Sequence, residues 1–160
     1  MKKIINYFCF FFIISCAGYE PIFSTKNTKF YIAEVRLSDN NKISRKIEKK
    51  LQSYKVVDYN KTPYFLMVKS VINNQIVSKD SSGDPLIYLM TVRAEVKVIT
   101  KETRHYFNAD FFIDNIILEE SFNYNNQKNK FDLNQYKKSI EENLVNKIQE
   151  KLIIRLLTLE

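Results

Sequence analysis

Residues that break or turn a chain are scarce in this sequence. Its 160 residues include two glycines and three prolines, whereas Tyr, Phe, Ile and Val are abundant. Glycine and proline are the usual residues of tight turns, and aromatic and β-branched residues favour strands. The chain is therefore expected to form a few long elements and not many short strands.

Four segments show the alternation of apolar and polar residues that is typical of strands. The clearest is 86–100, in which Val92, Ala94, Val96 and Val98 alternate with Thr91, Arg93, Glu95 and Lys97. The other predicted strands are 30–37, 64–77 and 107–124, and a turn is expected at 81–85. In the last strand the apolar residues change from odd to even positions at Asp114 and Asn115, which requires a bulge or a break there.

Two segments carry apolar residues at helical spacing. In the first, Ile43, Ile47, Leu51 and Tyr54 recur every three or four residues, which predicts an amphipathic helix of about four turns. A polar loop is expected at 123–132. The second and longest helix is predicted at 133–159, with a buried stripe formed by Tyr136, Ile140, Leu144, Ile148, Leu152 and Leu156.

The order of these elements is strand, helix, three strands, helix. Helices on one face of a sheet bury one apolar face of every element. The sequence therefore predicts a single α+β domain at 30–160, a two-layer sandwich in which two helices pack on one face of a mostly antiparallel four-stranded sheet. The other face of the sheet is expected to be solvated or to meet a partner, and it carries Arg93, Glu95, Lys97, Asn108, Asp110 and Phe112.

The N-terminus has the order of an export signal. Lys2 and Lys3 precede an apolar run of 11 residues at 4–14, which is followed by Ser15 and Cys16. A bilayer-spanning helix needs about 20 apolar residues, so this run is too short to be an anchor. The pattern resembles the bacterial lipoprotein cleavage box, in which the cysteine is linked to a diacylglycerol and the bond before it is cut.

This resemblance implies a signal peptide at 1–15, lipidation of Cys16 and a lipidated tether at 16–29. Two acyl chains or more anchor a protein stably. Ala17, where an inner-membrane lipoprotein often has Asp, implies the outer membrane, with the domain on its periplasmic face. The alternatives are an uncleaved membrane tether, or a signal cut elsewhere with Cys16 an ordinary buried cysteine.

Charge and cysteine content narrow the possible partners. The net charge falls from +7 to +5 when Lys2 and Lys3 are removed with the signal, which favours phospholipid, lipopolysaccharide phosphate or an acidic protein. Nucleic acid is not expected, because an exported chain rarely meets it. Cys9 lies in the signal and Cys16 is lipidated, so neither disulfides nor cysteine metal sites are expected.

No set of residues predicts catalysis, and no cofactor is expected. His105 is the only histidine and lies near a predicted turn. Asp110 and Asp114 share a strand face, but Ca²⁺ needs six or more oxygen ligands and no third acidic residue has matching spacing. No catalytic or metal-binding residue is therefore assigned.

Two basic clusters are candidate binding surfaces. The first helix carries Lys42, Arg45, Lys46, Lys49 and Lys50, either as a solvated face or as a face for anionic lipid. Lys97, Lys101 and Arg104 lie near Tyr106 and Phe107 in a predicted hairpin, and cations beside aromatic rings suit a phosphorylated amphiphile such as lipopolysaccharide. The alternative is that these charges at a hairpin tip only increase solubility.

The mature start of the chain resembles that of the lipopolysaccharide-assembly lipoprotein family LptE in its alphaproteobacterial form. The residues that carry the likeness are Cys16, Ala17, Gly18, Tyr19, Glu20, Pro21, Ile22 and Phe23, with Ala17 inserted after the cysteine. The order of elements is also similar, including Phe122, Asn123 and Tyr124 before a polar loop and a long helix.

The resemblance implies a non-enzymatic outer-membrane protein. Members of this family sit as a plug within the outer-membrane barrel LptD, help the barrel to assemble and bind lipopolysaccharide. The first alternative is a periplasmic lipid-binding or accessory lipoprotein of a transport complex that has no barrel partner. A lipid-anchored hydrolase is the second.

Overall fold

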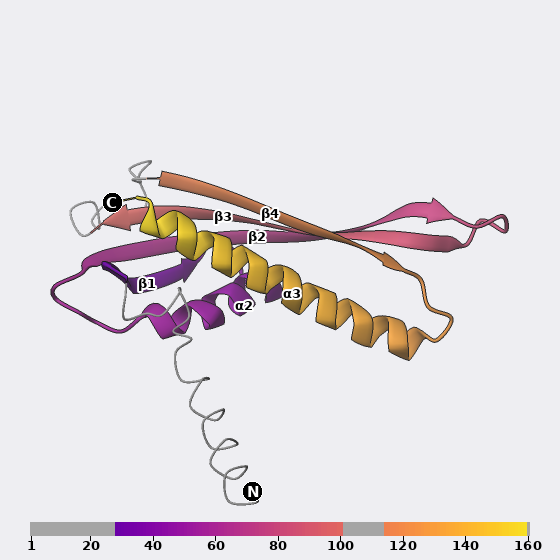
Figure 1. Ribbon diagram of the computed structural model, residues 1–160, viewed down its shortest axis with the longest axis horizontal. Helices are drawn as coiled ribbons and strands as arrows, with labels where there is room; N and C mark the ends of the chain where they lie inside the picture. The colour runs from indigo at the N-terminus through magenta and orange to yellow at the C-terminus, as the bar shows by residue number, and fades with distance from the viewer. Residues whose placement is uncertain (1–27, 101–113, 160) are drawn as a thin grey trace, which may run out of the picture.

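The alternating segments pair into one open sheet, and its strands follow one another in the order of the chain (Figure 1). The computed structural model describes residues 28–100 and 114–159. The strands are β1 (Phe30–Leu37), β2 (Thr62–Lys79), β3 (Pro85–Thr100) and β4 (Asp114–Asn125). Residues 107–113, which were also predicted as strand, lie outside the described residues.

β1 is the one parallel neighbour in this sheet. It pairs in parallel with β2, while β2 with β3 and β3 with β4 are antiparallel. A parallel pair needs a crossover connection, and residues 38–61 provide it. β2 and β3 are joined by a tight turn, in which the Asp80 carboxylate accepts backbone hydrogen bonds from Ser82 and Asp84, each at 2.9 Å. The predicted α+β class with a mostly antiparallel sheet is confirmed.

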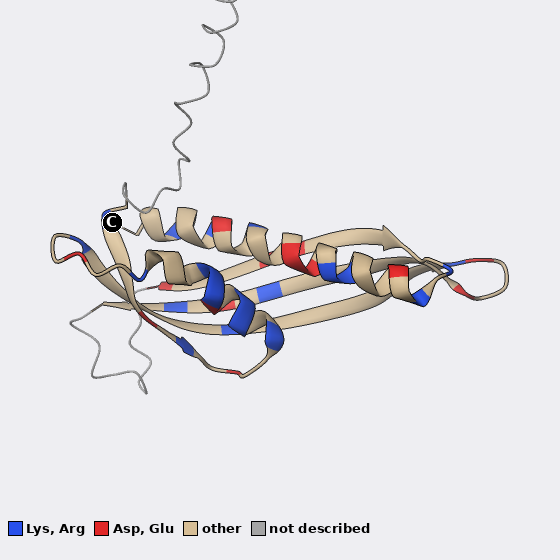
Figure 2. Ribbon diagram, turned by 90° about the horizontal axis from the view of Figure 1, so that it is seen from below, with Lys and Arg blue, Asp and Glu red and all other residues tan. Residues whose placement is uncertain are grey.

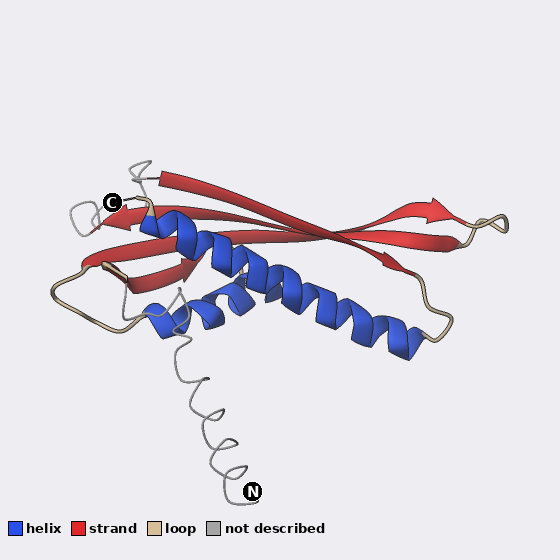
Figure 3. Ribbon diagram, in the orientation of Figure 1, coloured by secondary structure: helices blue, strands red, loops and turns tan. Residues whose placement is uncertain are grey.

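Both helices pack on one face of the sheet (Figure 3). The first is α2 (Lys42–Leu51), which runs on into a 3-10 turn, η3 (Gln52–Tyr54), and the second is α3 (Lys130–Leu157). The loop predicted at 123–132 is wrong at both ends. β4 continues to Asn125, and α3 begins at Lys130 because the Asn129 side chain accepts a hydrogen bond from the Phe131 amide at 2.9 Å.

The core lies between the two helices and one face of the sheet. The even-numbered residues of β2, β3 and β4 form this face, together with Phe30, Ile32 and, after a bulge, Val35 of β1. The register aligns Val68, Val96 and Ile116 across three strands, and their side chains are buried. Above them lies the predicted stripe of α3, which is buried from Ile140 to Leu156. Tyr136 is the exception, because 37% of its surface is exposed. The even-numbered face predicted for β4 is confirmed. β4 pairs with β3 without a register shift from Asp114 to Asn125, so no bulge lies at Asp114 and Asn115, and the odd-numbered apolar residues before them lie outside the described residues.

We expect Leu144→Ala to lower the free energy of unfolding by about 2–5 kcal/mol, because it leaves a cavity where α3 packs on the sheet. Leu144 is 1% exposed. The neighbouring exposed residue provides the matched control, since Asn143→Ala should change stability by less than about 0.5 kcal/mol. Urea unfolding followed by circular dichroism measures both, and equal effects would contradict the assigned packing.

Candidate functional site

The residues assigned from sequence are described only in part. Lys97 lies in β3 on the face of the sheet turned away from the helices, and it is partly buried between Met67 and Asn115 on the neighbouring strands. Outside the described residues lie Cys16, Lys101, Arg104, His105, Asn108, Asp110 and Phe112.

The described part of the uncovered face has charges of alternating sign. The register sets Lys69 beside Glu95 on adjacent strands, and Arg93 beside Glu119. Opposite charges at paired positions stabilise a sheet by roughly 0.2–1 kcal/mol each. As predicted, Arg93, Glu95 and Lys97 share this face, which is polar at its centre.

The basic face of α2 is directed at α3 and not only at solvent. Figure 2 shows the Lys and Arg positions of α2 beside the acidic positions of α3. Lys46 Nζ lies 2.8 Å from a Glu141 oxygen and 3.1 Å from a Glu142 oxygen. Lys42 extends this network to Glu141 at 2.9 Å, and Lys50 extends it to Glu142 at 2.5 Å. Three of the five cations therefore join the two helices.

This network shifts the pKa values of its members. Burial alone would raise the pKa of Glu141, but hydrogen bonds from Lys46 and Lys42 outweigh it and lower the pKa. Hydrogen bonds from Lys50 and Lys46 lower the pKa of Glu142. Burial opposes the charged form of Lys46, yet the two carboxylates raise its pKa. All three groups are thus held in their charged forms.

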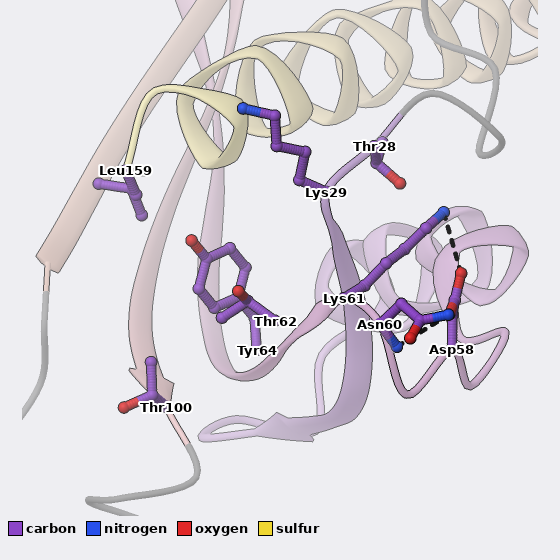
Figure 4. A pocket seen from close by; sticks show the side chains of 9 residues that line it. All are labelled: Thr28, Lys29, Asp58, Asn60, Lys61, Thr62, Tyr64, Thr100 and Leu159. Atoms are coloured by element: carbon purple, nitrogen blue, oxygen red, sulfur yellow. Dashed lines mark hydrogen bonds and ion pairs between the residues drawn. The ribbon is translucent and has the colours of Figure 1, made fainter.

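A pocket of about 620 Å³ lies at the end of the sheet where the described chain begins. Figure 4 shows Thr100 and Leu159 on one side of it and Asp58, Asn60 and Lys61 on the other. The Asp58 carboxylate is engaged by Lys61 Nζ at 3.7 Å and by the Asn60 amide at 3.0 Å. The lining is completed by Thr28, Lys29, Thr62 and Tyr64.

Hydroxyl groups and two lysines make this pocket suitable for a polar or anionic group. The described residues that line it include neither histidine nor cysteine, and their one carboxylate is engaged by a lysine and a backbone amide. They therefore contain no paired nucleophile and base. Elsewhere in residues 28–100 and 114–159, no group of three His, Cys, Asp or Glu is placed to hold a metal ion. None of the described helices is long and apolar enough to cross a membrane.

An aromatic cluster lies at the opposite end, beyond the start of α2. Tyr88 and Tyr124 stack with ring centroids 5.3 Å apart, and Tyr136 meets Tyr124 edge-on at 6.0 Å. The Tyr124 hydroxyl donates to Asn74 Oδ1 at 2.9 Å, and Lys137 Nζ lies 5.2 Å from the centre of the Tyr88 ring. This cluster was not predicted from the sequence. Its one signal was the pair of aromatic residues at even positions of β4, Phe122 and Tyr124.

The fold is similar to that of lipoproteins whose structures are known. No protein-family model and no curated protein sequence matches the chain. The crystal structure of rare lipoprotein B from Shewanella oneidensis is similar over 79% of this chain and 98% of its own, with a TM-score of 0.51 and 12% identity. A minor lipoprotein from Acinetobacter baumannii is similar over 82% of this chain and 92% of its own, with a TM-score of 0.58 and 9% identity. The chain shares the fold of these lipoproteins.

The charged network between the helices predicts how stability depends on pH. A carboxylate whose pKa is lowered by folding adds stability above its ordinary pKa, here 4.5, and loses it as the pH falls through the lowered value. Stability should therefore decrease below about pH 4.5. Glu141→Gln should flatten this decrease and cost on the order of 1 kcal/mol at pH 7. Lys46 acts in the opposite direction, because its contribution is lost as the pH rises past 10.5.

Urea unfolding midpoints measured from pH 3 to 7 test this prediction. The matched control is Glu150→Gln, since Glu150 is exposed on the same helix and makes no ion pair with any described residue. This variant should keep the slope of the unsubstituted chain. If Glu141→Gln and the unsubstituted chain had the same slope, the network would not account for the acid sensitivity.

Proposed function

We propose that this chain is an outer-membrane lipoprotein, anchored through Cys16 on the periplasmic face, that partners an LptD-type barrel in lipopolysaccharide assembly. The observation that carries the proposal is the fold, which the chain shares with rare lipoprotein B over 98% of the latter's length. The lipoprotein cleavage box and the LptE-like segment at 16–23 support it from the sequence. The proposed role is structural and not catalytic.

The dimensions of the sheet suit a plug inside a barrel. β2 has 18 residues and β3 has 16. At about 3.3 Å per residue, β2 is roughly 60 Å long, whereas a bilayer with its headgroups is about 40–45 Å thick. Strands of this length can extend through a barrel lumen and beyond it. The alternating charges of the uncovered face suit the polar interior that such barrels have.

Lipopolysaccharide is the second proposed ligand, with Lys97, Lys101 and Arg104 as its binding residues. Cations pair with phosphate groups, and neighbouring apolar side chains suit acyl chains. Lys97 lies on the uncovered face at the end of β3 that leads to the other two. The covalent lipid on Cys16 would hold this surface near the membrane in which the ligand is handled.

The partnership predicts that an LptD-type barrel co-purifies with the tagged full chain from envelopes of cells that express the barrel. Cys16→Ser should abolish labelling by a fatty-acid probe and reduce recovery of the barrel, because the chain is no longer held at the membrane. Ser15→Ala provides the matched control, since it keeps a small residue before the cysteine and should leave labelling unchanged. Recovery of the chain without the barrel would favour an accessory lipoprotein that has no barrel partner.

The lipopolysaccharide site predicts a loss of affinity upon charge reversal. Lys101→Glu combined with Arg104→Glu should weaken binding of fluorescent lipopolysaccharide at least about tenfold, because two charge-assisted contacts are lost. The same charge change at Lys128, just before α3, and at Lys130, its first residue, should change the affinity much less, because both are exposed at the start of that helix. Equal effects of the two pairs would indicate general attraction by net charge and would contradict the assigned site.

A further inference from the structure

β2 has a free edge, because it is much longer than the strand beside it. β1 has 8 residues and pairs with Thr62–Val68, the first part of the 18 residues of β2. The residues after β1 form the next hydrogen bonds with β2, beginning with the Ser38 amide, which donates to Val68 O at 2.9 Å. At Ser70 the amide donates to Asp39 Oδ2 at 3.1 Å and the carbonyl accepts from Asn41 Nδ2 at 2.6 Å. The edge is thus covered as far as Ser70.

Beyond Ser70 the edge has no partner in the described residues. Alternate residues of a strand direct both backbone groups to the same side. Backbone amides or carbonyls form hydrogen bonds on this side of β2 at Thr62, Val68 and Ser70. The even-numbered positions therefore direct their backbone groups outward. The next three are Ile72, Asn74 and Ile76, and no described group forms a hydrogen bond with their outward amides and carbonyls. Six backbone groups therefore remain available for another strand.

This edge also lacks the usual protection against pairing. Edge strands are commonly guarded by charged side chains or proline. No charged residue and no proline occurs from Ser70 to Ser78, and four apolar side chains are exposed there by 40–56%. These are Val71, Ile72, Ile76 and Val77. β4, the other outer strand, carries Glu119 and Glu120.

Three lysines surround the free edge. Lys69 precedes the uncharged stretch, Lys79 follows it, and Lys137 lies over the ring of Tyr88, which is the register neighbour of Ile76. Lys69 lies beside Glu95 on β3, but none of the three lysines is within ion-pair distance of a described carboxylate. The surface therefore combines open backbone groups, apolar side chains and positive charge.

We propose that the edge formed by Ile72, Asn74 and Ile76 binds an extended segment of a partner protein, which adds to the sheet as a fifth strand. The segment alternates apolar residues and carries acidic side chains at its ends, where they meet Lys69, Lys79 and Lys137. Backbone hydrogen bonds provide affinity in this mode of recognition, and the side chains provide specificity. An acyl chain or a phosphate group cannot satisfy alternating amides and carbonyls along a strand.

A second copy of this chain is a poorer occupant than an acidic segment. Antiparallel pairing of the edge with itself, centred on Asn74, would bring Lys69 of each copy close to Lys79 of the other. Like charges that lie close together repel each other. The uncharged stretch itself has no carboxylate to offset them.

A synthetic peptide tests the proposal on the full, lipidated chain in detergent. The probe is a fluorescent dodecapeptide of alternating Val and Thr with Glu at both ends, and the same peptide with Lys at both ends is its control. We expect the Glu-ended peptide to bind at least about tenfold more tightly than the Lys-ended one. Hydrogen–deuterium exchange should slow at the amides of Ile72, Asn74 and Ile76 when the Glu-ended peptide is added.

Two pairs of variants test the backbone and the charge separately. Ile72→Pro removes one outward donor and should weaken binding about tenfold, whereas Ile72→Thr keeps this donor and should weaken it less than about threefold. Lys137→Glu should reduce the preference for the Glu-ended peptide about threefold or more, because one of the three positive charges at the edge becomes negative. If the proline variant does not fold, the Lys137→Glu variant still tests whether the edge binds the acidic peptide.

Several results would overturn the proposal. They are failure of the Glu-ended peptide to bind, equal affinity of the two peptides, and equal effects of Ile72→Pro and Ile72→Thr. Protection of the same amides by self-association without peptide would assign the edge to a second copy, and protection by phospholipid vesicles would assign it to lipid. All components are purified, so the outcome does not depend on whether the chain partners a barrel.

Discussion

Backbone hydrogen bonding along β2 is the constraint on which the rest of this structure depends. The side of β2 that faces β3 is paired along nearly its whole length, whereas the other side needs separate partners. β1 provides them only at first, because the polar run after Leu37 ends the strand and Asn41 caps α2. Asp39 and Asn41 then close the edge at Ser70. The sequence that begins the first helix thereby also sets where the sheet becomes open.

The two helices divide the sheet into a covered and a less covered half. α3 extends along it, but α2 is only 10 residues long, so no second helix covers the distal part of β2. The apolar core holds the layers together, since burial contributes about 25 cal/mol for each Å². Ion pairs are weaker, and Glu141 and Glu142 act mainly by fixing how α2 lies beside α3. The same shortness of α2 leaves Ile72 and Ile76 exposed by 40% and 49%.

Periodicity predicted which face of each element is apolar, and the structure confirms this for Val92–Val98 and for α3 from Ile140 onward. Periodicity could not predict which other element packs on or pairs with each face. The parallel pairing of β1 and the carboxylates opposite Lys46 depend on residues distant in the sequence, such as Glu142, 96 positions away. The partial exposure of Tyr136 likewise depends on what packs beside it from distant parts of the sequence, and not on its helical spacing. Of the residues predicted to bind lipopolysaccharide, Lys97 alone belongs to the described part of the chain, and it lies on the uncovered face.

The opposite ends of the sheet suit different tasks. The described chain begins at Thr28, which is buried at the end of the sheet where the first residues of β2 pair with the last residues of β3. The turn at 80–84 lies at the other end (Figure 1). A lipid on Cys16 would therefore tether the end that contains the pocket. The free edge and the aromatic cluster lie farther from this attachment, along a rigid sheet of paired strands. Anchoring at one end then leaves the other end accessible to a partner, because nothing in the attachment requires the outward groups of Ile72, Asn74 and Ile76.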